Sequence, residues 1–149
     1  MIVGVGIDRV LLHRVDQIYE RWGKRFTERV LGEQEQLVFQ ERLGRGSAGR
    51  SRAVSYLAKR FAAKEAVGKA LGVGLAYPMS LHSLEVLNDA KGAPHAVFHK
   101  ALAAWVSSRQ LRVNVSLSDE QDAAVALAIV ESNAGPRPPG PCAVRGKPS

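Results

Sequence analysis

The sequence predicts an α+β protein in which a small antiparallel sheet packs against a long central helix and shorter helices. Residues 53–71 are rich in Ala and Leu, which favour helix, and Gly72 ends this longest helical stretch. Residues 111–117 alternate between apolar and polar side chains, which is typical of a half-buried strand. The link at 118–122 connects this strand to the apolar run at 123–131, so we expect the two to form a hairpin.

The chain opens with a strand and an amphipathic helix. Residues 2–10 are rich in Val, Ile and Gly, and we interpret them as a mostly buried strand. Gly4 and Gly6 weaken a strand, so they indicate a place where another part of the backbone approaches closely. Residues 13–22 carry apolar side chains at helical spacing with basic residues along one edge.

The next segments are charged. Residues 25–31 are expected to form a turn or short helix, and residues 33–43 form a charged helix after Gly32. The composition of 44–52 indicates a basic, flexible loop. Its three arginines, Arg45, Arg50 and Arg52, either cover an anion or are simply solvated.

A second hairpin is predicted after the long helix. Residues 81–88 and 93–98 are expected to be strands, joined by a turn with Gly92 at the left-handed position. Residues 98–109 have apolar positions at helical spacing and should form a helix before the last hairpin.

Composition divides the chain into one domain, residues 1–133, and a basic tail, residues 134–149. The tail holds five of the 7 prolines, so we expect it to be disordered, and we assign it no function. No apolar run approaches the roughly 18 residues of a membrane span, and no signal peptide is recognisable. The single cysteine, Cys142, excludes an internal disulfide and fits a cytoplasmic protein.

The net charge of +7 suits an anionic partner, which could be a nucleic acid, a nucleotide or an acidic protein. No Walker loop, zinc pattern or nucleophile elbow is present in the sequence. The charge alone does not choose among these partners.

Two acids stand in segments that otherwise resemble core. Asp8 ends the opening strand, and Glu65 lies within the long helix, four residues before Lys69. Hard cations such as Mg²⁺ take oxygen ligands, often one or two carboxylates plus a substrate phosphate. Asp8 and Glu65 therefore suit a metal site, with Lys69, Lys64 and Arg60 as phosphate ligands. The alternatives are a surface Glu–Lys pair, a snorkelling lysine and a strand-end cap at Asp8.

Four ordered blocks around these residues resemble the bacterial holo-acyl-carrier-protein synthases of the 4'-phosphopantetheinyl transferase superfamily. The resemblance spans roughly residues 1–131 and also implies that superfamily's α+β fold. The blocks are Ile2-Val-Gly-Val-Gly-Ile-Asp8, Lys59-Arg-Phe-Ala-Ala-Lys-Glu65-Ala with Lys69-Ala-Leu-Gly72, Leu84-Glu-Val-Leu-Asn-Asp with Gly92-Ala-Pro94, and Val115-Ser-Leu-Ser-Asp-Glu120.

The resemblance implies Mg²⁺-dependent transfer of 4'-phosphopantetheine from coenzyme A to a serine of apo-acyl carrier protein, as in fatty acid biosynthesis. Adenosine 3',5'-bisphosphate is the other product. Asp8 and Glu65 match the metal ligands, and Glu65 or a metal-bound water is the candidate base. Lys69 matches the catalytic lysine that stabilises the pyrophosphate, while Arg60 and Lys64 match basic residues that face the nucleotide phosphates.

The resemblance also implies contacts with protein partners. Arg14, and less closely Arg25, match basic residues that hold the acidic carrier protein. Ser118 remains a plausible coenzyme A contact, but Asp119 stands where many relatives have histidine, so that role is not carried over. The family forms trimers with active sites between subunits, and we expect a homotrimer.

Two other functions compete with this interpretation. A small basic nucleic-acid-binding domain would use the arginine-rich loop, but aromatic residues are only 6% of the chain and do not interleave with basic ones. A non-catalytic trimeric scaffold would leave Asp8 and Glu65 unexplained. We therefore expect an enzyme that binds neither nucleic acid nor membrane.

Overall fold

The computed structural model describes residues 1–134, and the predicted tail beyond Ala134 lies outside this range. Five strands and five α-helices alternate irregularly along these residues, with a 3₁₀ turn at Gly46–Ala48. In chain order they are β1 (Ile2–Leu11), α1 (Leu12–Trp22), α2 (Lys24–Val30), α3 (Glu33–Leu43), α4 (Gly49–Leu71), β2 (Leu84–Asn88), β3 (Pro94–Phe98), α5 (Lys100–Ser108), β4 (Leu111–Asp119) and β5 (Ala123–Ser132).

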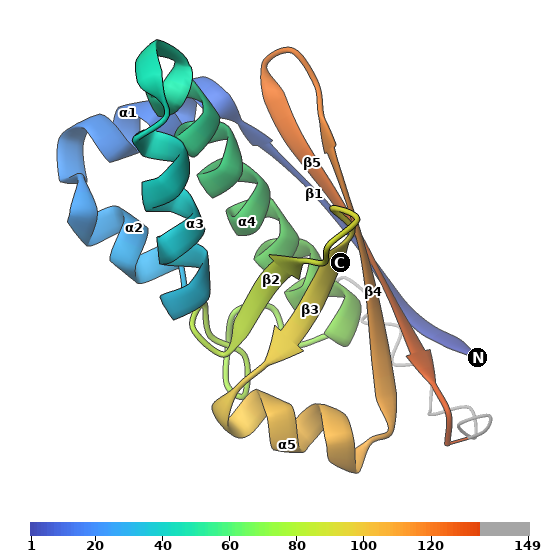
Figure 1. Cartoon of the computed structure of the whole chain (residues 1–149). Helices are drawn as coiled ribbons and strands as arrows, with labels where there is room; N and C mark the ends of the chain where they lie inside the picture. Colours follow the sequence, from blue (N-terminus) through green and yellow to red (C-terminus); the bar gives the residue numbers. More distant parts are fainter. Residues whose placement is uncertain (135–149) are drawn as a thin grey trace, which may run out of the picture.

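The strands form two antiparallel sheets, which confirms the predicted α+β class. One has the order β1-β5-β4, and the other is the β2-β3 hairpin. Helix α4 lies between the larger sheet and the helices α1 to α3, as Figure 1 shows. The long helix is therefore covered on opposite sides, which explains why most of its residues are buried.

Strand β1 and helix α4 approach each other at backbone distance. A Cβ atom at Gly4 would collide with the carbonyl oxygen of Ala70, and one at Gly6 would collide with that of Ala66. Only glycine permits this approach, so the prediction made for Gly4 and Gly6 is confirmed. This contact also places Asp8 near α4, because Asp8 lies two residues after Gly6 on the same side of β1.

The core has two parts that meet along α4. One contains alanines of α4 together with residues of β2, α5 and β5, and the other lies between α4 and the helices α1 to α3. Small residues dominate the surface of α4. Its alanines at 53, 58, 62, 63, 66 and 70 are all buried.

The prediction that β1 is mostly buried was wrong for one of its faces. Val5 and Ile7 are 59% and 62% exposed, because β1 packs against α4 only through its alternate residues. Val5 pairs with Ile129 and Ile7 with Leu127, so these four side chains share the outer face of the sheet. An apolar face this exposed on the isolated chain indicates an interaction surface.

The predicted loop at 44–52 was also partly wrong. Helix α4 begins at Gly49 instead of residue 53, and Gly49 is buried against the carbonyl groups that end α3. Arg50 donates to Asp16 and Glu20 of α1, which fixes the first turn of α4. Tertiary contacts therefore override a composition that favours a loop. Strand β2 likewise begins at Leu84, later than the predicted residue 81.

Within residues 1–134, none of the helices combines the length and the apolar character that crossing a bilayer requires.

Candidate active site

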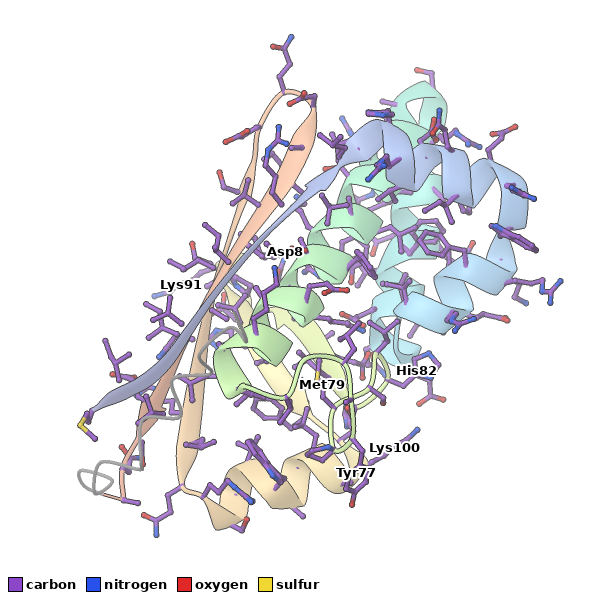
Figure 2. All side chains as sticks on the ribbon, turned by 180° about the vertical axis from the view of Figure 1, so that it is seen from behind. Asp8, Tyr77, Met79, His82, Lys91 and Lys100 are labelled. Carbon is purple, nitrogen blue, oxygen red and sulfur yellow. The ribbon has the colours of Figure 1, made fainter. Side chains whose placement is uncertain are left out.

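Asp8 and Lys69 meet where β1 crosses α4. The Lys69 ammonium donates to Asp8 Oδ1 at 3.0 Å and to the Ile7 carbonyl oxygen at 3.1 Å. The Asp8 side chain is 18% exposed and that of Lys69 is 52% exposed, so the pair is open to a ligand from solvent. Figure 2 labels Asp8 on the strand beside this helix.

Glu65 completes this group, because it lies one turn before Lys69 on the same face of α4. Burial raises the pKa of Glu65 above its ordinary value, and the nearby Asp8 carboxylate raises it further, while Lys69 lowers it. The influence of Asp8 means that the two carboxylates are close enough to interact electrostatically. The structure thus brings together three predicted residues: Asp8, Glu65 and Lys69.

The chemistry of these side chains suits a hard divalent cation. Two carboxylates provide oxygen ligands only, and among residues 1–134 no cluster of three or more His, Cys, Asp or Glu offers a complete protein-only site. Mg²⁺ is usually held by one or two carboxylates together with substrate phosphates. The Lys69 ammonium beside them adds a positive charge where a phosphate would bind.

Lys64 does not join this group, which argues against its predicted contact with phosphates. It is rotated by about 100° from Glu65 on the helix. Its ammonium is fully buried and donates to Glu35 Oε1 at 2.6 Å, to the Val30 carbonyl at 2.7 Å and to the Leu81 carbonyl at 2.7 Å. A lysine ammonium has three hydrogens, and these protein oxygens use all of them.

Arg60 is also buried, with 2% of its surface exposed. One guanidinium nitrogen donates to Asn88 Oδ1 at 2.9 Å, and the guanidinium lies 4.4 Å from the centre of the Tyr56 ring. Burial raises the pKa of Tyr56 to about 12, although Arg60 opposes this shift. This packing does not support the predicted phosphate contact of Arg60, because the guanidinium lies against Tyr56 and Asn88 and not beside Asp8 and Glu65.

Ser118 and Asp119 lie on opposite faces of β4. Asp119 accepts from Lys59 of α4 at 3.1 Å and so faces the helix. Ser118 therefore points to the outer face of the sheet, where it is paired with Val125 and is exposed. Within one chain, Ser118 is thus separated from Asp8 and Glu65 by the sheet.

Arg14 and Arg25, the predicted carrier-binding residues, are both exposed on the surface of α1 and α2. Arg25 lies 5.8 Å from the Trp22 ring and lines a groove of about 400 Å³. The groove is lined by both apolar and basic side chains. Its lining residues are Ile18, Trp22, Arg25, Phe26 and Arg29.

Two of the three arginines of the predicted loop are paired with acids, while Arg52 is exposed. Arg50 is paired with Asp16 and Glu20, and Arg45 is paired with Glu41. Their charges are therefore largely matched by acids of the same chain, which removes the main support for a nucleic-acid-binding surface.

Sequence reasoning missed two buried acids, Glu35 and Glu85. Glu35 pairs with Lys64, and Glu85 Oε2 accepts from the backbone amides of Gln34 and Glu35 at the start of α3. A signal was present for Glu85, because it interrupts the apolar strand between Leu84 and Val86.

Comparison with known proteins gives a consistent result. Residues 4–128 match the family model described as the 4'-phosphopantetheinyl transferase superfamily. The chain is 42% identical over 140 residues to a holo-[acyl-carrier-protein] synthase of Burkholderia vietnamiensis, which covers 94% of this chain and 94% of the relative.

Solved structures agree. The crystal structure of holo-[acyl-carrier-protein] synthase from Neisseria meningitidis superimposes with a TM-score of 0.79 at 37% identity, covering 89% of this chain and 100% of the other. A Bacillus anthracis synthase in complex with CoA (3',5'-ADP) gives a TM-score of 0.71 at 35% identity, covering 89% and 98%.

Proposed function

The chain belongs to the 4'-phosphopantetheinyl transferase superfamily, as a holo-[acyl-carrier-protein] synthase, and we propose that it uses Mg²⁺ to transfer 4'-phosphopantetheine from coenzyme A to a serine of apo-acyl carrier protein. The observation that carries the proposal is the meeting of Asp8, Glu65 and Lys69 where β1 crosses α4. We further propose that the reaction serves fatty acid biosynthesis in the cytoplasm, in keeping with a single cysteine.

The reaction makes one bond and breaks one. The serine oxygen attacks the phosphorus that carries the pantetheine arm, and the bond from this phosphorus to the bridging oxygen breaks, releasing adenosine 3',5'-bisphosphate. Asp8 and Glu65 would hold Mg²⁺, which when bound neutralises charge on the pyrophosphate. Lys69, whose ammonium is half exposed, would donate to the pyrophosphate as negative charge develops on the leaving oxygen.

The serine must also lose a proton. Glu65 is our candidate acceptor, because its carboxylate lies beside Asp8 and Lys69 at the proposed site. Asp8 is less suited to this role, since its carboxylate already accepts a hydrogen bond from Lys69.

The groove beside α1 and α2 is our proposed docking site for the carrier protein. Arg25 and Arg29 line it, and Arg14 lies exposed nearby on α1. An acidic helix with apolar residues on one face would match the basic and apolar side chains that line this groove. Charge complementarity of this kind speeds encounter and makes binding sensitive to salt.

We also propose that the chain forms a homotrimer through the outer face of its larger sheet. Val5, Ile7 and their neighbours leave this face apolar and exposed in one chain. Ser118 lies on the same face, so self-association would allow it to reach the active site of another copy. Replacing both Val5 and Ile7 by Asp should yield monomers in sedimentation analysis, whereas unchanged trimers would exclude this face.

Mass spectrometry of an apo-acyl carrier protein tests the function directly. After incubation with coenzyme A, Mg²⁺ and the protein, the carrier should gain the mass of one phosphopantetheine group. The Asp8→Ala variant should give no gain while keeping its circular dichroism spectrum. If the wild-type protein leaves the carrier unmodified, the proposal is wrong, and full activity of Asp8→Ala would remove the metal assignment.

A further inference from the structure

The ion pair between Lys64 and Glu35 is the most buried charged contact in residues 1–134. Both side chains are 0% exposed, and Nζ lies 2.6 Å from Oε1. Taking two charges out of water is expensive, so a fully buried pair is weak evidence for stability and calls for another explanation. Lys64 immediately precedes Glu65, the residue that we propose as metal ligand and base.

The pair connects α4 to four other segments. The Lys64 ammonium also donates to the Val30 carbonyl at the end of α2 and to the Leu81 carbonyl just before β2. Glu35, in the first turn of α3, accepts from the Val86 amide of β2 at 2.9 Å and from the Gly32 amide at 2.9 Å. These bonds are directional, so they specify both the rotation of α4 and its position along its axis.

The face of α4 that packs on β1 is poorly suited to this task. Its contact with β1 is made by Ala66 and Ala70 against Gly4 and Gly6. Such small residues allow a close approach but provide few projections that interlock and resist sliding. The polar bonds of Lys64 are therefore the most deeply buried of the directional contacts that fix α4 against rotation and sliding.

Small movements of α4 would separate the proposed metal ligands. A rotation by one residue turns a side chain by about 100°, and a slip by one turn moves it by about 5.4 Å. Mg²⁺ requires oxygen ligands at about 2.1 Å in near-octahedral geometry. Even a fraction of either movement would take Glu65 out of range of a cation held by Asp8.

We propose that Lys64 is a positioning residue, whose buried bonds to Glu35, Val30 and Leu81 hold α4 in the one orientation that places Glu65 beside Asp8. The proposal rests on the proposed function, since it assumes that Asp8 and Glu65 bind the metal. It replaces the predicted phosphate contact of Lys64 with an indirect role, exerted through the helix.

The test is direct binding of Mn²⁺, as a spectroscopic substitute for Mg²⁺, followed by electron paramagnetic resonance on the full-length protein. Lys64→Met combined with Glu35→Gln removes both buried charges, so neither is left unpaired. We expect this double variant to bind Mn²⁺ on the order of tenfold more weakly and to transfer at least tenfold more slowly.

Two further variants separate positioning from loss of stability. Leu102→Ala removes a fully buried side chain of α5 that makes none of these bonds, so it should lower Tm and leave Mn²⁺ affinity unchanged. Glu35→Gln alone keeps one acceptor oxygen for Lys64 but loses the acceptor for the Val86 amide, so it should give a smaller loss of Mn²⁺ affinity. Wild-type Mn²⁺ affinity in this variant would count against the proposal if the double variant does not fold.

Each remaining outcome is decisive. Wild-type Mn²⁺ affinity in the folded double variant, or an equal loss in Leu102→Ala, would overturn the positioning role. The proposed metal site would be overturned by a different result, namely that the wild-type protein does not bind Mn²⁺ or that the Asp8→Ala variant binds it equally well. The two failures are therefore distinguishable.

Discussion

The Lys69 ammonium lies 3.0 Å from Asp8 Oδ1, so a positive charge occupies the position next to one proposed metal ligand. The same ammonium donates to the Ile7 carbonyl, which ties the end of α4 to β1. A divalent cation at Asp8 would compete electrostatically with this lysine, while a bound pyrophosphate would attract it. Lys69 should therefore weaken binding of the metal alone and speed the transfer reaction.

Replacing Lys69 by Met should separate these effects. Mn²⁺ should bind the free protein about fivefold more tightly, because a like charge is removed from a half-exposed site. The kcat for transfer should fall by about 10²–10³-fold, because a donor to the leaving group is lost. Titration of Mn²⁺ and steady-state kinetics measure the two quantities. Lys59→Met is the control, since Lys59 pairs with Asp119, and weaker Mn²⁺ binding in Lys69→Met would contradict the prediction.

Replacing Glu65 by Gln should stabilise the metal-free protein at neutral pH. The pKa of Glu65 is raised on folding, so the folded state binds this proton more tightly than the unfolded state. The resulting stability is fully present below the ordinary value of 4.5 and is lost as pH rises through the folded pKa. The Tm of Glu65→Gln should therefore exceed that of wild type by a few degrees at neutral pH and match it in acid.

The same experiment with Mg²⁺ should reverse the order. Metal binding stabilises the folded state of the wild-type protein, and Glu65→Gln should lose this gain together with transfer activity. Differential scanning fluorimetry across pH, with and without Mg²⁺, provides the comparison. An equal gain from Mg²⁺ in both proteins would show that Glu65 is not a ligand.

Replacing Gly6 by Ala should disrupt both the fold and the site. The added Cβ would collide with the Ala66 carbonyl and crowd the Ala70 amide, so β1 must move away from α4. We expect a loss of about 1–3 kcal/mol in the free energy of unfolding, measured with urea. Affinity for Mn²⁺ should also fall, because Asp8 moves with β1. In Gly44→Ala, where the added Cβ has ordinary contacts at 3.6 Å, both quantities should stay near wild type.

Replacing Arg14 and Arg25 by Ala should weaken binding of the carrier protein. Both are exposed near the groove of α1 and α2, and losing two charges there should raise the KM for the carrier on the order of tenfold at low salt. The KM for coenzyme A should be unchanged. Arg109→Ala removes an exposed arginine that lies over Trp105 of α5 and serves as the control. An equal rise in both KM values would reject a role specific to the carrier.

The sequence predicted most elements of the fold and the meeting of Asp8 with Glu65. The helices and strands follow from local periodicity, and the close approach at Gly4 and Gly6 follows from the absence of a side chain. Burial of Lys64 could not be predicted, because its partner Glu35 is 29 residues away and joins it only through the packing of α3 on α4.

Two other errors have a similar origin. The first turn of α4 is rich in Gly, Ser and Arg, and its contacts with α1 and with the end of α3 favour the helix. The outer face of β1 has the composition of a core strand, although one chain leaves it exposed. A sequence shows that such side chains must be covered, but it does not show whether the cover comes from the same molecule.

The pairing of β1 with β5 has a consequence for synthesis on the ribosome. The strand that carries Asp8 emerges first, yet its partner in the sheet, Ala123–Ser132, is made near the end. Until that strand emerges, the first strand has no neighbour in the sheet, and Asp8 has no fixed place opposite Glu65. A nascent chain can therefore form its helices early, but it cannot assemble the active site until the last strand has been translated.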